Sequence, residues 1–200
     1  VFAEINNGQF LHSPSLTDLD YDGDLDVISG STNGKLFAWQ ETDLDGNGRA
    51  DLYFELDCGA PISTVAVIGD WSVNETGREI AVGLENGELC LIRETGEIIW
   101  KKNISGAAIT GLAGFLGPAQ NGLICVDSQS QVTYVDESSE LVWQESFSQY
   151  GIVNYPAIGN LNGDDNLNIV LTTDQGYIIV LELNGSGEIF LSLNAESTCS

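Results

Sequence analysis

The chain has 200 residues, of which 42% are hydrophobic, and its 30 acidic and 6 basic side chains give a formal net charge of −24. This length suffices for one domain with a substantial core. So acidic a surface argues against nucleic acid and anionic membranes as partners, because both are bound through cationic faces. No apolar run approaches the roughly twenty residues of a membrane-spanning helix, so we expect no membrane insertion.

Residues 1–11 begin the chain with a short run of strand-forming side chains. We expect them to add an extra strand outside the repeats described below, either completing the last repeat or pairing with a neighbouring molecule. The chain contains no Met, which predicts that it is a processed or excised product.

The next predicted element is a metal-binding loop within a β-hairpin. Oxygen-bearing side chains occupy every second position of residues 18–26, and Gly23 stands at the sixth position. Alternate residues can then point inward around a hard cation while the glycine allows a sharp turn. Ca2+ suits such a loop because it accepts about six to eight oxygens in a loose geometry. The predicted ligands are Asp18, Asp20, Asp22, Asp24 and Asp26.

A second copy of this pattern follows at residues 43–51. Neither copy is an EF-hand, because the twelfth position holds Ser29 or Phe54 instead of Glu, and strand-like runs follow at 25–29 and 52–56. Each loop is expected to close through its ninth residue. Ordinary acidic turns are the alternative, since Asp, Asn and Gly are common turn residues, but two copies in register favour two Ca2+ sites. The residues predicted for the second site are Asp43, Asp45, Asn47, Arg49 and Asp51.

Internal repetition is the other strong signal. Each repeat has four short runs of β-branched or aromatic residues bounded by Gly, Asn and Asp, typical of four antiparallel strands. Asn-Gly at 33–34 and 86–87 predicts two-residue hairpins with positive φ at both residues. No stretch has a sustained helical period, so an all-β chain with almost no helix is expected. The repeats span residues 13–57, 62–103, 108–147 and 154–193.

The acidic pattern weakens along the repeats. The second repeat keeps Asp70, Ser72 and Asn74 with broken spacing, and the third has no carboxylate in the corresponding segment. The fourth has the right spacing but mostly neutral amides, which predicts a much weaker site. Its alternating residues are Asn160, Asn162, Asp164, Asn166 and Asn168.

These segments resemble two families of repeats. Residues 18–34 are similar to the FG-GAP or VCBS-type calcium-binding propeller repeat, an apolar strand, an Asp-rich loop and a strand ending in Gly. Residues 86–100 and 132–143 resemble the quinoprotein-like propeller repeat. The resemblance implies a β-propeller-like fold of four four-stranded antiparallel blades in a single domain. The blades either close into a ring or form an arc or array.

Topology adds a constraint on the sites. In a four-stranded meander the first and third turns leave the same edge, so both calcium loops are expected to lie close together on the first blade. The opposite edge then carries the Asn-Gly turns and the links between blades. Its candidate ligand-binding residues are His12, Asn33, Tyr150, Asn154 and Tyr155.

Cysteines and sequons give weaker indications. Cys90 and Cys125 lie in apolar strands, which favours core packing. Cys58 and Cys199 lie in turn-like or terminal segments and are candidates for a disulfide bond in an oxidising compartment. Glycosylation sequons begin at Asn74, Asn103 and Asn184.

The functional expectation is a non-catalytic, calcium-stabilised module for adhesion or ligand binding, secreted or at the cell surface. Calcium loops of moderate charge suit extracellular Ca2+ concentrations, and the expected partner is a protein or a carbohydrate. The chain has one His and no nucleophile elbow, P-loop or haem motif. Two alternatives stay open: a self-assembling subunit of a surface filament or coat, and a calcium-dependent polysaccharide-active enzyme.

Overall fold

The computed structural model describes residues 8–72, 75–117, 120–161, 163–164 and 166–192. They form four antiparallel sheets of four strands, and in each sheet the strands follow one another in chain order. The all-β prediction is confirmed, and the one helical element of the described chain is a single 3-10 turn, η1 (Ser148–Tyr150).

The first two sheets contain strands β1 to β8. The first sheet consists of β1 (Ser15–Thr17), β2 (Asp26–Gly30), β3 (Lys35–Trp39) and β4 (Leu52–Asp57). The second consists of β5 (Val67–Gly69), β6 (Glu79–Gly83), β7 (Glu88–Arg93) and β8 (Ile98–Asn103).

The last two sheets repeat this arrangement. The third consists of β9 (Ile109–Leu116), β10 (Asn121–Asp127), β11 (Gln131–Asp136) and β12 (Leu141–Ser146). The fourth consists of β13 (Ala157–Gly159), β14 (Asn168–Thr172), β15 (Tyr177–Glu182) and β16 (Gly187–Ser192).

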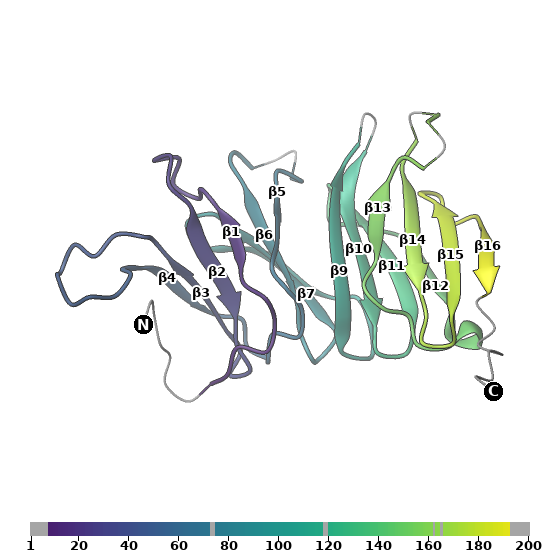
Figure 1. The fold of residues 1–200 in the computed structure, drawn as a ribbon, viewed down its shortest axis with the longest axis horizontal. Coiled ribbons are helices and arrows are strands. Elements are labelled where there is room, and N and C mark those ends of the chain that lie inside the picture. Colours follow the sequence, from purple (N-terminus) through teal and green to yellow (C-terminus); the bar gives the residue numbers. More distant parts are fainter. Residues whose placement is uncertain (1–7, 73–74, 118–119, 162, 165, 193–200) are drawn as a thin grey trace, which may run out of the picture.

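The four sheets stand in a row in chain order (Figure 1). The first strands of consecutive sheets, β1, β5, β9 and β13, lie next to one another. The first and fourth sheets lie at opposite ends of the row (Figure 1). The described residues therefore have the open arrangement rather than the closed ring that was its alternative.

Alternating side chains along the inner strands build three separate cores. On β6, Ile80 and Val82 pack in the core between the first and second sheets, whereas Ala81 packs in the core between the second and third. On β10, Ile124 and Val126 point into the core shared with the fourth sheet. Because strand side chains alternate between the two faces of a sheet, one buried strand of an inner sheet packs against both neighbouring sheets.

The tight turns differ in detail from the sequence prediction. Ser31 N donates to Lys35 O at 2.9 Å and Gly34 N donates to Ser31 O at 3.1 Å, so three residues rather than two separate the bonded pair. Gly34 has a φ of 84°, but Asn33 is not among the described residues with positive φ. The turn is thus a three-residue hairpin with its left-handed residue last, which requires positive φ only at the glycine.

Residues 8–11 do not extend the fourth sheet. Gln9 O accepts a hydrogen bond of 3.0 Å from Thr32 N, in the β2–β3 turn. The ring of Phe10 packs edge-on against Phe37 and Trp39 of β3, with centroid separations of 6.0 and 5.7 Å. Packing of these aromatic rings thus holds the segment on the outer face of the first sheet. Residues 1–7 lie outside the described residues.

Three of the four cysteines are in described parts of the chain. Cys58, Cys90 and Cys125 are buried with free thiols, which confirms the core placement of Cys90 and Cys125. Cys199 and Asn74 lie outside the described residues, while Asn103 and Asn184 are exposed. No helix in the described chain has the length and apolar character needed to cross a membrane.

Candidate metal centre

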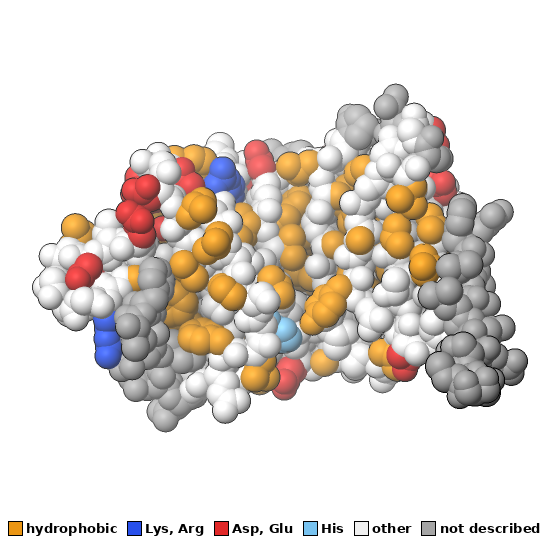
Figure 2. Space-filling view, in the orientation of Figure 1, with side chains coloured by type: hydrophobic (Ala, Val, Ile, Leu, Met, Phe, Trp, Pro, Cys, Tyr) orange, Lys and Arg blue, Asp and Glu red, His pale blue; other side chains and the backbone are white. Residues whose placement is uncertain are grey.

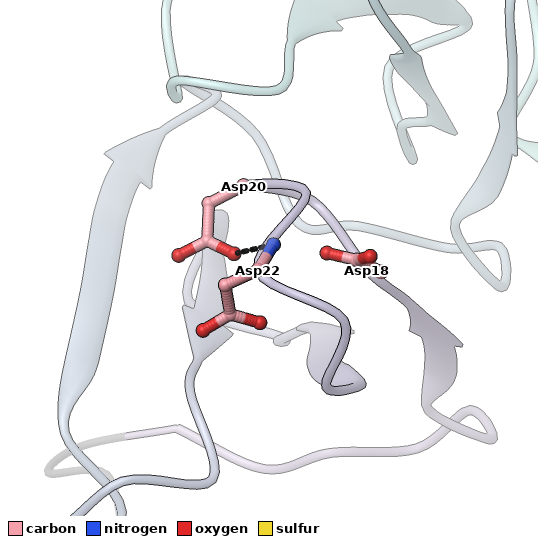
Figure 3. Close-up of side chains that lie close together, drawn as sticks. All are labelled: Asp18, Asp20 and Asp22. Carbon is pink, nitrogen blue, oxygen red and sulfur yellow. Dashed lines mark hydrogen bonds between the residues drawn. The ribbon is translucent and has the colours of Figure 1, made fainter.

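Three carboxylates of the β1–β2 loop converge. Ligand oxygens of Asp18, Asp20 and Asp22 all lie within 4.8 Å of one another (Figure 3). Within the described residues this is the one group of three or more His, Cys, Asp or Glu side chains gathered so closely. The negative charges of these carboxylates repel one another, and a cation between them would offset that repulsion.

The loop backbone holds these side chains in place. Gly23 N donates to Asp18 Oδ2 at 3.2 Å, Asp22 N to Asp20 Oδ1 at 3.3 Å, and Asp24 N to Asp22 Oδ1 at 2.9 Å. Gly23 has a φ of 101°, so the sharp turn at the sixth position is the one that the sequence predicts. Each carboxylate keeps one oxygen on the loop and leaves the other for a further partner.

Asp18 and Asp20 differ in the surroundings of their second carboxylate oxygens. Asp18 Oδ1 is buried and has no hydrogen-bond partner among the described residues. A buried carboxylate oxygen without a partner is costly, and a cation is a partner that would satisfy it. Asp20 Oδ2 instead accepts a bond of 2.5 Å from Gln40 Nε2, just after β3.

The other predicted ligands of the first loop lie outside the cluster. Asp24 is exposed. Asp26 is 4% exposed, and its Oδ2 accepts a bond of 2.7 Å from Leu19 N. Burial raises the pKa of Asp26, with a smaller contribution from the neighbouring acidic side chains, and the bond from Leu19 opposes the shift. Asp26 therefore closes the loop, as the ninth residue was expected to do.

A basic side chain from the second sheet also reaches the first loop. Arg78 Nη1 donates to Thr17 Oγ1 at 2.6 Å and to the carbonyl oxygen of Asp18, and its guanidinium stacks over the Tyr21 ring at 5.2 Å. The sequence analysis missed Arg78 and Gln40. Neither belongs to the alternating pattern, and only the packing of strands and sheets places them at the loop.

The second acidic loop repeats the same framework of hydrogen bonds. Gly48 N donates to Asp43 Oδ2 at 2.8 Å, Asn47 N to Asp45 Oδ1 at 3.0 Å, and Leu44 N to Asp51 Oδ2 at 2.7 Å. These donors and acceptors occupy the same positions as in the first loop. The resemblance between the two loops thus extends from sequence to backbone geometry.

The second loop has one carboxylate fewer at this point, because Asn47 stands where the first loop has Asp22. Asp43, Asp45 and Asp51 do not form a group like that of the first loop in the part of the chain that the structure describes. Asn47 Nδ2 donates to Asp45 Oδ2 at 2.7 Å, so its amide presents a donor rather than an acceptor. Arg49 is exposed. Because its side chain is positively charged and has no acceptor, only its backbone carbonyl oxygen could bind a cation.

The two loops are neighbours at one end of the first sheet. Gln40 begins the β3–β4 loop, and its bond to Asp20 links that loop to the β1–β2 loop. Acidic side chains gather at this end in the space-filling view (Figure 2).

The second and fourth sheets carry related loops. In the second, Glu79 Oε2 accepts bonds of 2.7 Å from Trp71 N and 3.2 Å from Ser72 N, and Glu79 is 1% exposed. Its Oε1 is buried without a partner, and burial raises its pKa. This closing role of Glu79 was not predicted from the sequence.

The fourth sheet uses amides for the same purpose. Asn168 Oδ1 accepts a bond of 3.1 Å from Leu161 N, and Asn160 Oδ1 accepts one of 2.6 Å from Gly163 N. Asp164 Oδ1 accepts a bond of 2.9 Å from Asn166 N. Asn162 lies outside the described residues. The loop therefore keeps its closing bond while supplying few charged oxygens.

The candidates on the opposite edge have mostly structural contacts. Asn33 Oδ1 accepts a bond from Ser31 Oγ, and Asn154 Nδ2 donates to Thr172 Oγ1 at 3.3 Å. The rings of Tyr150 and Tyr177 pack edge-on with centroids 5.4 Å apart. Tyr155 is exposed and His12 is half-buried.

Comparisons with known proteins place the fold. No protein-family model matches the chain, and a search of curated proteins finds no significant match. Among solved structures, BBS1N in complex with ARL6DN is 12% identical with a TM-score of 0.67, and the alignment covers 90% of this chain and 53% of that one. BamB from Moraxella catarrhalis is 14% identical with a TM-score of 0.56, covering 91% and 50%.

A computationally designed protein, Ika4, is 13% identical with a TM-score of 0.60, covering 94% of this chain and 93% of that one. The chain thus spans about half the length of the BBS1N and BamB chains. The fold is propeller-like. At these identities the likeness extends to the fold alone.

Proposed function

We propose that this chain is a non-catalytic, calcium-stabilised propeller module that binds a protein or carbohydrate ligand outside the cell. The observation that carries the proposal is the group of Asp18, Asp20 and Asp22, whose ligand oxygens lie within 4.8 Å of one another. The buried, unpartnered Asp18 Oδ1 supports it, because a cation would satisfy this atom.

Calcium has a structural role in this proposal. Asp18, Asp20 and Asp22 would hold the ion, and the hydrogen bonds from Asp22, Gly23 and Asp24 N–H groups hold those side chains ready. A formal charge of −24 opposes a compact state through self-repulsion, which bound cations offset. Calcium binding and folding stability are therefore coupled. The second loop, with Asn47 in place of the third carboxylate, binds more weakly.

A ligand-binding surface is proposed on the face formed by the first strands. In Figure 2 the middle of this face is largely uncharged, with hydrophobic side chains spread over β1, β5, β9 and β13. Exposed apolar residues within or next to these strands include Leu16, Leu116 and Tyr155. In so acidic a protein, an uncharged face is the part best suited to close contact with a neutral surface.

A calcium titration tests the structural role. The melting temperature of the calcium-free protein should rise with Ca2+, since a ligand at about 100 times its Kd stabilises by about 2.7 kcal/mol. Asp22→Asn keeps the acceptor for Asp24 N but removes one charge, so it should weaken the Ca2+ affinity measured by calorimetry. Glu85→Gln removes one exposed charge from the β6–β7 turn and should leave the affinity unchanged.

Two results would contradict the proposal. One is a set of melting curves that superimpose in EDTA and in millimolar Ca2+. The other is an equal loss of affinity in Asp22→Asn and Glu85→Gln, which would indicate a diffuse charge effect.

Self-assembly into a filament or coat is a second candidate, favoured by the open row. The first and fourth sheets lie at opposite ends (Figure 1). On the fourth sheet Val170, Ile178 and Val180 are half-buried and alternate with residues of the core shared with the third sheet. Contacts between unlike ends that do not close generate filaments.

Light scattering across a concentration series tests this candidate. Val180→Lys on the fourth sheet should reduce assembly, while Val142→Lys at an exposed position of β12 should not. A wild type that stays at 21.4 kDa at every concentration, with and without Ca2+, would refute assembly.

A further inference from the structure

Two thiols from different sheets meet in the core between the first and second sheets. Cys58, directly after β4, is 1% exposed, and Cys90 in the middle of β7 is 0% exposed. Both belong to the same hydrophobic cluster, and each thiol perturbs the pKa of the other, raising that of Cys58 and lowering that of Cys90. Among the cysteines of the described chain, only these two belong to this cluster.

Backbone and lysine contacts fix this arrangement independently of the thiols. Cys90 pairs across the sheet with Lys101 of β8. Lys101 Nζ donates to Cys58 O at 3.2 Å, and Cys58 N donates to Gly34 O at 2.8 Å. The segment that carries Cys58 is thus bound on one side to its own sheet and on the other to the strand beside Cys90.

We propose that Cys58 and Cys90 form a disulfide bond that joins the first and second sheets when the chain folds in the presence of a disulfide-bearing oxidant. This pairing replaces the Cys58–Cys199 bond that the sequence suggested. Cys125 is not a competitor, because it packs in the separate core between the second and third sheets.

The chemistry is two thiol–disulfide exchanges. The Cys90 thiolate attacks one sulfur of the oxidant, forming a mixed disulfide and releasing one thiol.

The thiolate of Cys58 then attacks Cys90 Sγ. The Cys58–Cys90 bond forms, the mixed disulfide breaks, and a second thiol leaves. Two electrons reduce the oxidant, and the two cysteine protons end on the released thiols. Because both side chains are buried in the folded protein, the exchange takes place before the first two sheets have closed on each other.

Thiol counting after oxidative refolding tests the proposal. The full chain is unfolded in reductant, refolded with reduced and oxidised glutathione, acidified, denatured and alkylated. We expect alkylation of two of the four cysteines, an intact mass lower by about 2 Da before alkylation, and a cross-linked peptide pair containing Cys58 and Cys90. A reduced sample treated in parallel should label all four.

Single variants identify the pair. Cys125→Ser should retain the cross-link and label at one cysteine only, whereas Cys58→Ser and Cys90→Ser should each label at all three remaining cysteines. Four labelled thiols in the oxidised wild type, or a cross-link between Cys58 and any residue other than Cys90, would overturn the proposal. Because the wild type alone gives this result, a variant that fails to fold does not affect the outcome.

Discussion

The loops of the first and second sheets share one closing hydrogen bond but differ in the acidic side chains that lie within them. Asp26 accepts from Leu19 N in the first, and Glu79 accepts from Trp71 N in the second. Only the first loop also gathers Asp18, Asp20 and Asp22. In both loops a carboxylate at the start of the following strand thus accepts a hydrogen bond from a backbone N–H of the loop. Affinity for a cation is a separate property, set by the carboxylates added to that frame.

Removing the closing side chain should have the largest effect. Asp26→Ala leaves a buried Leu19 N–H without an acceptor, which costs about 1–3 kcal/mol. Asp51→Ala breaks the equivalent bond at an exposed loop, where water replaces the acceptor, and should cost less. Chemical denaturation of both variants in the same buffer measures the difference.

Asp26→Asn serves as the control for that measurement. It installs the side chain that closes the loop of the fourth sheet, where Asn168 accepts from Leu161 N. It should therefore be less destabilising than Asp26→Ala. If the two substitutions cost the same free energy of unfolding, the closing bond is not what shapes these loops.

The second prediction concerns pH and the second sheet. Burial raises the pKa of Glu79 above its ordinary value of 4.5, so the folded state binds this proton more tightly than the unfolded state. The contribution is fully favourable below the ordinary value and is lost as pH rises through the raised value. The Glu79→Gln variant carries no charge at this position at any pH, so it does not lose stability in this way as pH rises.

The melting temperature of Glu79→Gln relative to wild type should thus increase between about pH 4 and pH 7. Glu85→Gln, at an exposed turn, provides the reference for removing a charge without burial. A difference between Glu79→Gln and wild type that is constant across this range would contradict the assignment of a buried, proton-retaining carboxyl group.

The smallest effect should come from the sixth-position glycines. Gly23 and Gly48 have φ values of 101° and 79°, and an added Cβ at either would meet no atom within 4 Å. Gly23→Ala and Gly48→Ala should each cost about 1 kcal/mol from backbone strain alone. Thermal melts in EDTA check this. A much larger cost at one loop would show that the two loops do not share a backbone frame.

Much of this architecture follows from local sequence patterns. Alternating apolar residues and Gly-bounded runs predict sixteen strands in four sheets, and the structure has them. The local frame of both acidic loops follows similarly, because its donors and acceptors lie within nine residues of each other. Hydrogen bonds between residues so close in the chain can be predicted from the spacing of residue types.

Contacts between residues far apart in the sequence are what the sequence does not reveal. Gln40 reaches Asp20 only after the strands of the first sheet pair, and Arg78 reaches Asp18 only after the first two sheets pack. The position of Phe10 on the first sheet likewise depends on an aromatic surface formed by alternate residues of β3.

The division of β6 and β10 between two cores bears on how such a chain changes in length. Each inner sheet offers one surface to the unit before it and another to the unit after it. Duplication of an inner unit would set its following surface against a copy of its own preceding surface, and the row would grow by a sheet. Loss of an inner unit would shorten it in the same manner. Related sequences are therefore expected to differ by whole units from the middle of the chain.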